Sequence, residues 1–437
     1  MVLLCDGRLV CGCADPYGRR VLGDARTTSV SAVWTGETAS ALRQDLNGGG
    51  SKFCGDCPLK LPLTKDQQPP QRDLTVSSLP SRLYIETTAA CNISCEQACC
   101  APETGITRTR QAGMLDFELF KRVVDEAGPS LGRIDFFNYG EAFLHKRAVE
   151  MCEYIKSRFP HIYLYTSTNG LAFSEEQVRR LVRSGIDEVT FSIDGATAES
   201  YVKYRRRGDF EKALRNLRLA ADEKRAGGRD VPFLNWRYIL FTHNDSDQEM
   251  QLARETALSI GIDRLCWELT DHPENLFSRR FLRGTDDLAR IRHEIWDDNN
   301  LGNAIPGATP RAEIDVRGPV PLPGLPLVAR HGRPLTLRAR VRNASTRPFP
   351  AQATYGRRLV RLGAQLCAAD GSLMNRDYER AWLPASLAPG ARTEVPITIT
   401  APAEPGRYAL KFDLVSEGID WFEACGSPTT TKTLVVI

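Results

Sequence analysis

The sequence lacks a strong net charge and a long hydrophobic run. Its 57 Lys and Arg residues nearly balance 54 Asp and Glu residues, which leaves a net charge of +3 over 437 residues. A general nucleic-acid binder presents a concentrated basic face, so we expect no such role. No stretch of about eighteen apolar residues occurs, and charge interrupts the amino terminus too early for a signal peptide. We therefore expect a cytoplasmic protein that does not associate with membranes.

Cysteine, by contrast, is abundant and unevenly distributed. Nine of the 13 cysteines lie in the first hundred residues, and four of them, Cys91, Cys95, Cys99 and Cys100, lie within ten residues. In a reducing compartment clustered thiols more often bind metal or carry out redox chemistry than form disulfides. Three thiolates from one loop can hold three irons of a [4Fe–4S] cluster and leave the fourth iron open for a ligand. A disulfide pair or buried free thiols is the alternative.

The chain is long enough for two or three domains. Proline-rich stretches near residues 58–80 and 318–326 indicate boundaries. We therefore predict an amino-terminal cysteine-rich module (1–75), a central domain (81–300) and a carboxy-terminal domain (325–437).

The amino-terminal module contains cysteines in two separated groups. Cys5, Cys11 and Cys13 lie among turn-forming residues, and Cys54 and Cys57 follow about forty residues later. A core this small needs a metal or a similar cross-link to be stable alone. Zinc and an iron–sulfur cluster are both compatible with these ligands.

In the central domain β-like runs alternate with helical patterns, which predicts a parallel α/β fold. The expected strands are 81–88, 134–141, 161–170, 188–195, 233–241 and 264–270, with helical patterns at 117–126 and 146–159 among them. Period-two alternation places Thr190, Ser192 and Asp194 on one face of their strand. Three polar side chains in a helix-covered sheet indicate an interior that holds water or a ligand.

Two later strands add polar groups to this interior. Asn235 and Arg237 share a face of their strand, and an inward arginine either pairs with a ligand carboxylate or forms a buried ion pair with a protein acid. Cys266 and Glu268 share a face of the next strand. The commoner outcome for such a cysteine is a small core residue.

A cysteine loop between a first strand and a first helix, followed in order by Tyr-Gly-Glu, Asn-Gly and Ser-Ile-Asp-Gly, resembles the radical S-adenosylmethionine (SAM) superfamily. The resemblance implies a partial (β/α)6 TIM-like barrel with a SAM-binding [4Fe–4S] cluster on the cysteine loop. The usual spacing of that loop is C-x3-C-x2-C, whereas position 98 here is Ala98, so the third ligand is either Cys99 or Cys100. The SAM-binding residues that it implies are Tyr139, Gly140, Glu141, Thr168, Asn169, Ser192 and Asp194. SAM also has a carboxylate, which is the ligand considered for Arg237 beside the alternative of a buried ion pair with a protein acid.

The amino-terminal pattern resembles the SPASM or twitch auxiliary-cluster modules of the same superfamily, although those follow the radical domain. It implies an auxiliary [4Fe–4S] cluster with Cys5, Cys11 or Cys13, Cys54 and Cys57 as candidate ligands. The implied activity is reductive SAM cleavage and hydrogen abstraction from an unactivated carbon of a peptide or carbohydrate-type substrate, with electrons from a flavodoxin- or ferredoxin-type reductant. Net oxidation is favoured over epimerisation, in which Cys266 would donate the hydrogen. A non-catalytic iron–sulfur or zinc scaffold remains the alternative.

Beyond residue 325 no helical period occurs. Short β-like runs at 335–341, 359–367, 393–399, 408–414 and 432–437 predict an immunoglobulin-like antiparallel sandwich, which would bind a glycan or a protein partner. Trp382, Trp421 and Phe422 are interpreted as core residues, with a binding platform as the second option.

Overall fold

The computed structural model describes residues 1–12, 15, 17–47, 76, 79–96, 110, 113–296, 301–318, 325–352 and 358–437. The chain divides into two compact units. The first comprises Met1–Asp263 and Thr270–Arg279, and the second comprises Arg264–Leu269 and Arg280–Ile437.

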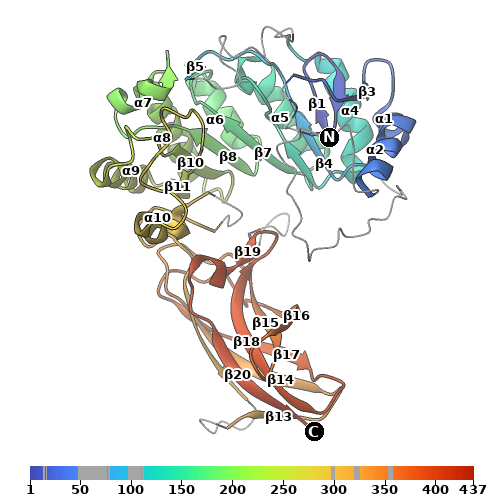
Figure 1. The fold of residues 1–437 in the computed structure, drawn as a ribbon, viewed down its shortest axis with the longest axis vertical. Coiled ribbons are helices and arrows are strands. Elements are labelled where there is room, and N and C mark those ends of the chain that lie inside the picture. Colours follow the sequence, from blue (N-terminus) through green and yellow to red (C-terminus); the bar gives the residue numbers. More distant parts are fainter. Residues whose placement is uncertain are drawn as a thin grey trace. The chain divides into compact units, whose positions relative to one another are not determined.

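The first unit is built on five neighbouring parallel strands (Figure 1). They are β4 (Arg82–Ile85), β6 (Arg133–Asp135), β7 (Tyr163–Thr168), β8 (Glu188–Ser192) and β10 (Phe233–Ile239), paired in this order. Four of them, β4, β7, β8 and β10, fall within runs that the alternating pattern predicts, and β6 overlaps only the start of its run at 134–141. The expected parallel α/β core is therefore confirmed, and the ends of the runs lie in loops that carry the polar motifs.

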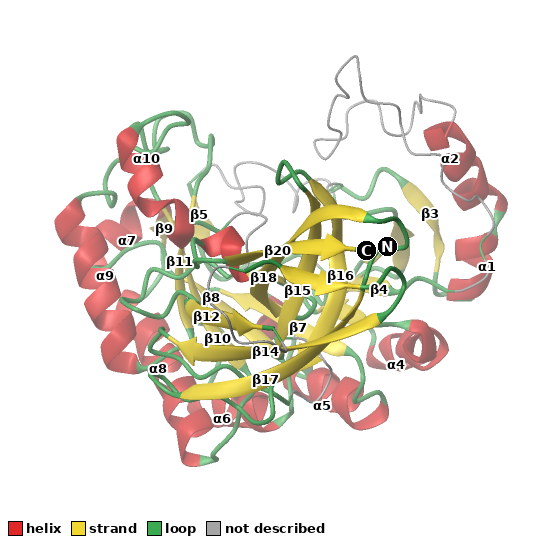
Figure 2. Cartoon of the chain, turned by 90° about the horizontal axis from the view of Figure 1, so that it is seen from below, coloured by secondary structure: helices red, strands yellow, loops and turns green. Residues whose placement is uncertain are grey.

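Helices follow the strands and lie around the outer side of the sheet (Figure 2). They are α4 (Phe117–Ala127), α5 (Ala148–Arg158), α6 (Glu175–Arg183), α7 (Ala198–Tyr204), α8 (Phe210–Ala226) and α9 (Asp247–Ile260), with short 3-10 turns at Gly128–Ser130 and Ala142–Leu144. Helix α4 shows why they form: Asp116 caps its first turn, and Phe120, Val123 and Val124 bury one face.

The amino terminus extends the same sheet. Strand β1 (Val2–Leu3) pairs in parallel with β4, and β2 (Arg8–Val10) and β3 (Val21–Asp24) continue antiparallel from it. Helices α1 (Val30–Thr35) and α2 (Glu37–Asn47) come next. The described part of residues 1–75 thus belongs to the first compact unit, together with the central strands.

The second unit contains two sheets that share one hydrophobic core. The first sheet orders β12 (Ala312–Arg317), β14 (Pro334–Asn343) and β17 (Arg392–Thr400); the second orders β13 (Leu327–Ala329), β20 (Thr430–Val436), β18 (Gly406–Ser416), β15 (Val360–Ala368) and β16 (Leu373–Trp382), with β19 (Asp420–Trp421) on β18. Strand β11 (Arg264–Glu268), helix α10 (Asp286–Ile291) and short 3-10 turns at Arg292–Glu294 and Phe422–Cys425 complete the unit.

The tryptophans of the second unit divide into two groups. Trp421 and Phe422 are 4% and 1% exposed, so their interpretation as core residues is confirmed. Trp382 is 56% exposed at the end of the edge strand β16, where Arg361 stacks on its ring at 3.6 Å. The core interpretation is therefore wrong for Trp382.

Within the described residues, no helix combines the length and the apolar character needed to cross a bilayer.

Candidate functional site

The turn after β6 packs directly against the backbone that precedes Cys91. Gly140 adopts φ = 84°, and a Cβ at this position would lie 2.5 Å from the carbonyl oxygen of Thr88 and 2.6 Å from that of Ala90. The amide of Glu141 donates to the same Ala90 oxygen at 2.8 Å. Only glycine combines this conformation with so close an approach. The Tyr-Gly-Glu motif and the cysteine loop therefore form one structural element.

Glu141 is buried and fully engaged by protein groups. Its Oε1 accepts hydrogen bonds from the Thr168 hydroxyl at 2.7 Å and the Phe143 amide at 3.3 Å, and its Oε2 accepts from the Asn169 amide at 2.8 Å. Burial raises the pKa of this carboxyl, and these donors oppose the shift. Glu141 thus ties the turn after β6 to the end of β7.

Asn169 joins the end of β7 to the cysteine loop. Its Nδ2 donates to Oδ1 of Asn92 at 2.8 Å and lies 3.7 Å from Sγ of Cys91. Its Oδ1 accepts from the amide of Leu171 at 2.9 Å, which fixes the orientation of the side-chain amide. The Asn-Gly motif therefore reaches the first cysteine of the loop.

Arg205 makes the corresponding contact to the second cysteine. Its Nη1 donates to Sγ of Cys95 at 3.4 Å and its Nε donates to Oδ2 of Asp194 at 2.5 Å. Arg205 lies in a run of charged residues, 203–207, of a kind that usually faces solvent, but its side chain is only 11% exposed. No local signal revealed the difference, since Arg206 and Arg207 beside it are exposed.

The electrostatics of this cluster favour a permanent cation. Burial alone would lower the pKa of Arg205, but the charges of Asp194 and Cys95 outweigh burial and raise it well above its usual value. Asp194 is fully buried, and its Oδ1 accepts from the amide of Ile239 at 2.7 Å. The guanidinium therefore stays charged beside the thiol of Cys95.

The strand faces that the alternation predicts are confirmed where side-chain contacts report them. Asn235 donates to the hydroxyl of Thr190 at 2.9 Å, and the hydroxyls of Ser167 and Ser192 lie 3.2 Å apart. Arg237 is the register partner of Ser192. Polar side chains from β7, β8 and β10 thus share one face near the carboxyl ends of the strands, the end where parallel α/β enzymes carry their chemistry.

A different cluster of charged side chains lies on β4 and β6. Asp135 is 1% exposed and pairs with Arg82 at 2.6 Å and with Arg133 at 2.7 Å. Arg133 also lies 5.5 Å from the ring of Tyr163 and 5.0 Å from that of Tyr165. The buried carboxylate of Asp135 is thus compensated by two arginines.

Of the expected auxiliary ligands, Cys5 and Cys11 are described, and Cys13, Cys54 and Cys57 lie outside the described residues. Cys5 is 5% exposed, and its amide lies 3.4 Å from Oε1 of Glu86. Burial, and then the charge of Glu86, raise the pKa of this thiol to about 12. Glu86 itself forms a fully buried bidentate pair with Arg110 at 2.7 and 2.8 Å.

The remaining expected residues are placed as follows. Tyr139 is half-buried in the turn after β6, and Cys266 is 1% exposed within β11 of the second unit. Cys99 and Cys100 lie outside the described residues. Within the described ranges, no three His, Cys, Asp or Glu side chains come together as a metal site.

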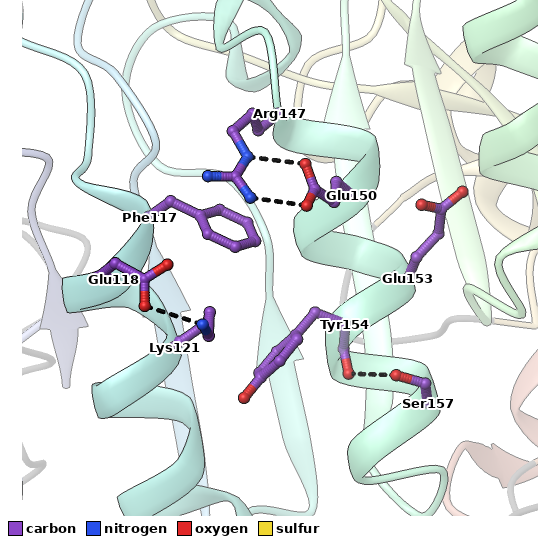
Figure 3. A pocket seen from close by; sticks show the side chains of 8 residues that line it. All are labelled: Phe117, Glu118, Lys121, Arg147, Glu150, Glu153, Tyr154 and Ser157. Carbon is purple, nitrogen blue, oxygen red and sulfur yellow. Dashed lines mark hydrogen bonds and ion pairs between the residues drawn. The ribbon is translucent and has the colours of Figure 1, made fainter.

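A surface groove of about 400 Å³ lies away from these residues, between α4 and α5 (Figure 3). Its charged groups are already paired: Arg147 with Glu150 at 2.7 Å and Lys121 with Glu118 at 2.8 Å. Arg147 also lies 3.3 Å from the centre of the Phe117 ring. The groove is therefore an ion-paired helix surface.

Comparison with known proteins agrees with the geometry. Residues 85–254 match the model of the radical SAM superfamily, and this range holds the cysteine loop, the Tyr-Gly-Glu turn, Asn169, Asp194 and Arg205. The chain contains a radical SAM domain.

Individual relatives of the radical SAM domain match it in part. The tungsten-containing aldehyde ferredoxin oxidoreductase cofactor-modifying protein of Pyrococcus furiosus is 34% identical over 114 residues, 26% of this chain and 30% of the relative. Mycofactocin maturase MftC of Mycobacterium tuberculosis is 32% identical over 190 residues, 43% and 45% of the two chains. The crystal structure of Streptococcus suis SuiB bound to SAM aligns with a TM-score of 0.35 and 14% identity over 44% of this chain and 41% of SuiB. The chain spans less than half the length of each.

A radical SAM domain uses a [4Fe–4S] cluster and SAM, which are therefore the cofactors of this chain. The described residues fit the cluster. Cys91 and Cys95 come from one loop, and each sulfur faces an N–H donor, from Asn169 and from Arg205. Thiolate ligands with hydrogen-bond donors at sulfur are the usual setting of an iron–sulfur cluster.

Proposed function

We propose that this chain is a radical SAM enzyme that abstracts hydrogen from an unactivated carbon of a peptide or carbohydrate-type substrate. One observation supports it most: three segments that are separate in the sequence contact one cysteine loop. Gly140 packs on the loop backbone, Asn169 contacts Cys91 and Arg205 contacts Cys95. When bound and reduced, the cluster supplies the electron that cleaves SAM to methionine and a 5′-deoxyadenosyl radical.

The proposed ligands of the SAM-binding cluster are Cys91, Cys95 and either Cys99 or Cys100. Among the expected SAM-binding residues we distinguish two roles. Glu141, Thr168 and Asp194 have carboxyl or hydroxyl groups that are occupied by protein partners, so we assign to them the shaping of the pocket. The assigned ligand contacts come from Tyr139, the backbone of Gly140 and Arg237. Asn169 and Ser192, whose side chains also contact protein groups, are proposed to line the same pocket.

We further propose an auxiliary [4Fe–4S] cluster in a SPASM-like amino-terminal module, with Cys5, Cys11 or Cys13, Cys54 and Cys57 as its candidate ligands. Five cysteines for four ligand positions favour full ligation of this cluster. A fully ligated cluster has no open iron and suits electron transfer, which favours net oxidation of the substrate.

The second unit is proposed to be an immunoglobulin-like module that binds a glycan or a protein partner. Two sheets around one core support this assignment, and Trp382 with Arg361 on its ring is an exposed aromatic group of the kind that binding surfaces use. A flavodoxin- or ferredoxin-type protein is the proposed reductant.

The experiment is anaerobic reconstitution with iron and sulfide, followed by dithionite reduction in the presence of SAM. We expect 5′-deoxyadenosine and methionine in equal amounts, and no product from a Cys91→Ala, Cys95→Ala double variant. Perdeuterated peptides and perdeuterated sugars are then compared as substrates, and deuterium in 5′-deoxyadenosine identifies the class. A fully reconstituted wild type that leaves SAM intact would contradict the proposal and favour the scaffold alternative.

A further inference from the structure

Arg205 is held opposite Cys95 by the backbone itself. The short strands β5 (Ser94–Cys95) and β9 (Arg205–Arg206) pair antiparallel, with Cys95 and Arg205 as direct register partners. The amide of Glu96 donates to the carbonyl oxygen of Tyr204 at 2.9 Å, which extends this pairing. The contact between guanidinium and thiol is therefore a consequence of strand register and does not depend on a flexible side chain alone.

Asp194 fixes the other side of the guanidinium. It accepts from Nε of Arg205 and, through its second oxygen, from the Ile239 amide at the end of β10. Arg205 and Asp194 are 11% and 0% exposed, so water screens their charges little. The guanidinium of Arg205 thus lies between the thiol of Cys95 and the carboxylate of Asp194. The pairing of β5 with β9 holds the thiol side, and the end of β10 holds the carboxylate side.

We propose that Arg205 is a positioning residue that donates a hydrogen bond to the cluster-ligating sulfur of Cys95 and, balanced by Asp194, sets the reduction potential of the cluster. The inference rests on the proposed function, because it takes Cys95 as a cluster ligand. Hydrogen bonds to the ligand sulfurs and nearby charge are established determinants of iron–sulfur potentials. Reduction adds one negative charge to the cluster, and a fixed cation beside a ligand sulfur stabilises that charge.

Replacing Arg205 and replacing Asp194 should therefore shift the reduction potential of the cluster in opposite directions. Arg205→Met removes the donor and its positive charge, so we expect a lower potential, by about 59 mV if the ratio of reduced to oxidised cluster changes about tenfold. Asp194→Asn removes the opposing carboxylate and should raise the potential. Loss of packing alone would lower cluster occupancy in both variants without shifts of opposite sign.

The test is a redox titration of the reconstituted full chain without SAM, followed by electron paramagnetic resonance. Arg206→Met is the matched control, because its side chain is 59% exposed, pairs with Glu96, and has no contact to a cysteine among those described. Arg205→Lys keeps the charge and should recover part of the shift. The double variant Arg205→Met, Asp194→Asn leaves no uncompensated buried charge, so we expect it to fold even if Arg205→Met alone does not, with a potential between those of the two single variants.

The outcomes separate this inference from the proposed function. Wild-type protein that binds no cluster contradicts both. The wild type can bind a cluster and cleave SAM while the reduction potentials of Arg205→Met and Asp194→Asn equal that of the control Arg206→Met within error. In that case only the role of Arg205 is refuted. A weaker affinity for SAM in Arg205→Met with an unchanged potential would likewise overturn it and assign the arginine to ligand binding.

Discussion

Replacing Gly140 by alanine tests whether the turn after β6 positions the cysteine loop. The residue has φ = 84°, and the new Cβ would lie 2.5, 2.6 and 2.7 Å from backbone atoms of Thr88, Ala90 and Ala89. These are backbone atoms, so no side-chain rotation relieves the contacts. Ordinary van der Waals contact begins at 3.4 Å, so the turn and the loop must separate by about 0.9 Å (3.4 minus 2.5).

The magnitude follows from two costs. The left-handed conformation costs an L-residue roughly 1–2 kcal/mol, and overpacking of a rigid contact costs about 1–3 kcal/mol more. We therefore expect the free energy of unfolding to fall by about 2–5 kcal/mol. A displacement near 1 Å at reacting groups lowers rates on the order of 100-fold, so SAM cleavage should fall by about that factor.

The assay is the initial rate of 5′-deoxyadenosine formation by reconstituted, dithionite-reduced protein, with chemical denaturation measured in parallel. Gly113→Ala is the matched control, because a Cβ there meets no atom within 4 Å and its φ is not positive. We expect the control to retain wild-type rate and stability. A Gly140→Ala protein with the rate and stability of the control would refute the close packing of turn and loop.

Three further predictions address other parts of the chain. Iron analysis should find about eight irons in the wild type. Only one of the variants Cys99→Ala and Cys100→Ala should lose about four irons, and that variant identifies the third ligand. Equal loss in both variants would contradict a single third ligand. Burial raises the pKa of Asp413 from 3.8 to about 7, so its contribution to stability is full below pH 3.8 and is lost as pH rises through 7. The free energy of unfolding should therefore fall by about 2–3 kcal/mol from pH 5 to pH 8 in the wild type and in the exposed control Asp377→Asn, but not in Asp413→Asn. An Asp413→Asn protein with the pH profile of the wild type would refute this. If the reaction is an oxidation, Cys266→Ala should turn the substrate over at the wild-type rate and the product should lack two hydrogens, whereas a variant that makes 5′-deoxyadenosine but no product would identify an epimerase.

The strands of the radical SAM domain could be predicted from sequence because their alternation and their bounding turns are local signals. The cysteine loop could be predicted from the clustering of its cysteines, and the polar strand ends from the alternation of polar and apolar residues. The amino-terminal strands were not, since β1 contains two residues and its partner β4 lies about eighty positions later. So short a strand has no measurable period, and only its long-range pairing defines it.

The role of Arg205 could not be predicted for a related reason. A run of basic residues beside a helix usually faces solvent, and the sequence contains nothing that distinguishes Arg205 from Arg206. Burial is decided by the register of β5 against β9 and by the carboxylate of Asp194, which are both tertiary contacts. For Glu141 the sequence predicted the motif but not its contacts. Its hydrogen bonds from Thr168 and Asn169 depend on the fold, because these residues lie at the end of the next strand.

The electron paramagnetic resonance spectrum of the reduced, reconstituted chain, recorded with and without SAM, tests most directly whether the cysteine loop and the polar strand ends form one site. We expect a [4Fe–4S]⁺ signal whose shape changes when SAM binds, and we expect a Cys91→Ala, Cys95→Ala variant to lose the SAM-sensitive signal. A wild-type chain whose cluster signal is insensitive to saturating SAM, or that same double variant with an unchanged SAM-sensitive signal, would contradict the assignment of this loop as the SAM-binding centre.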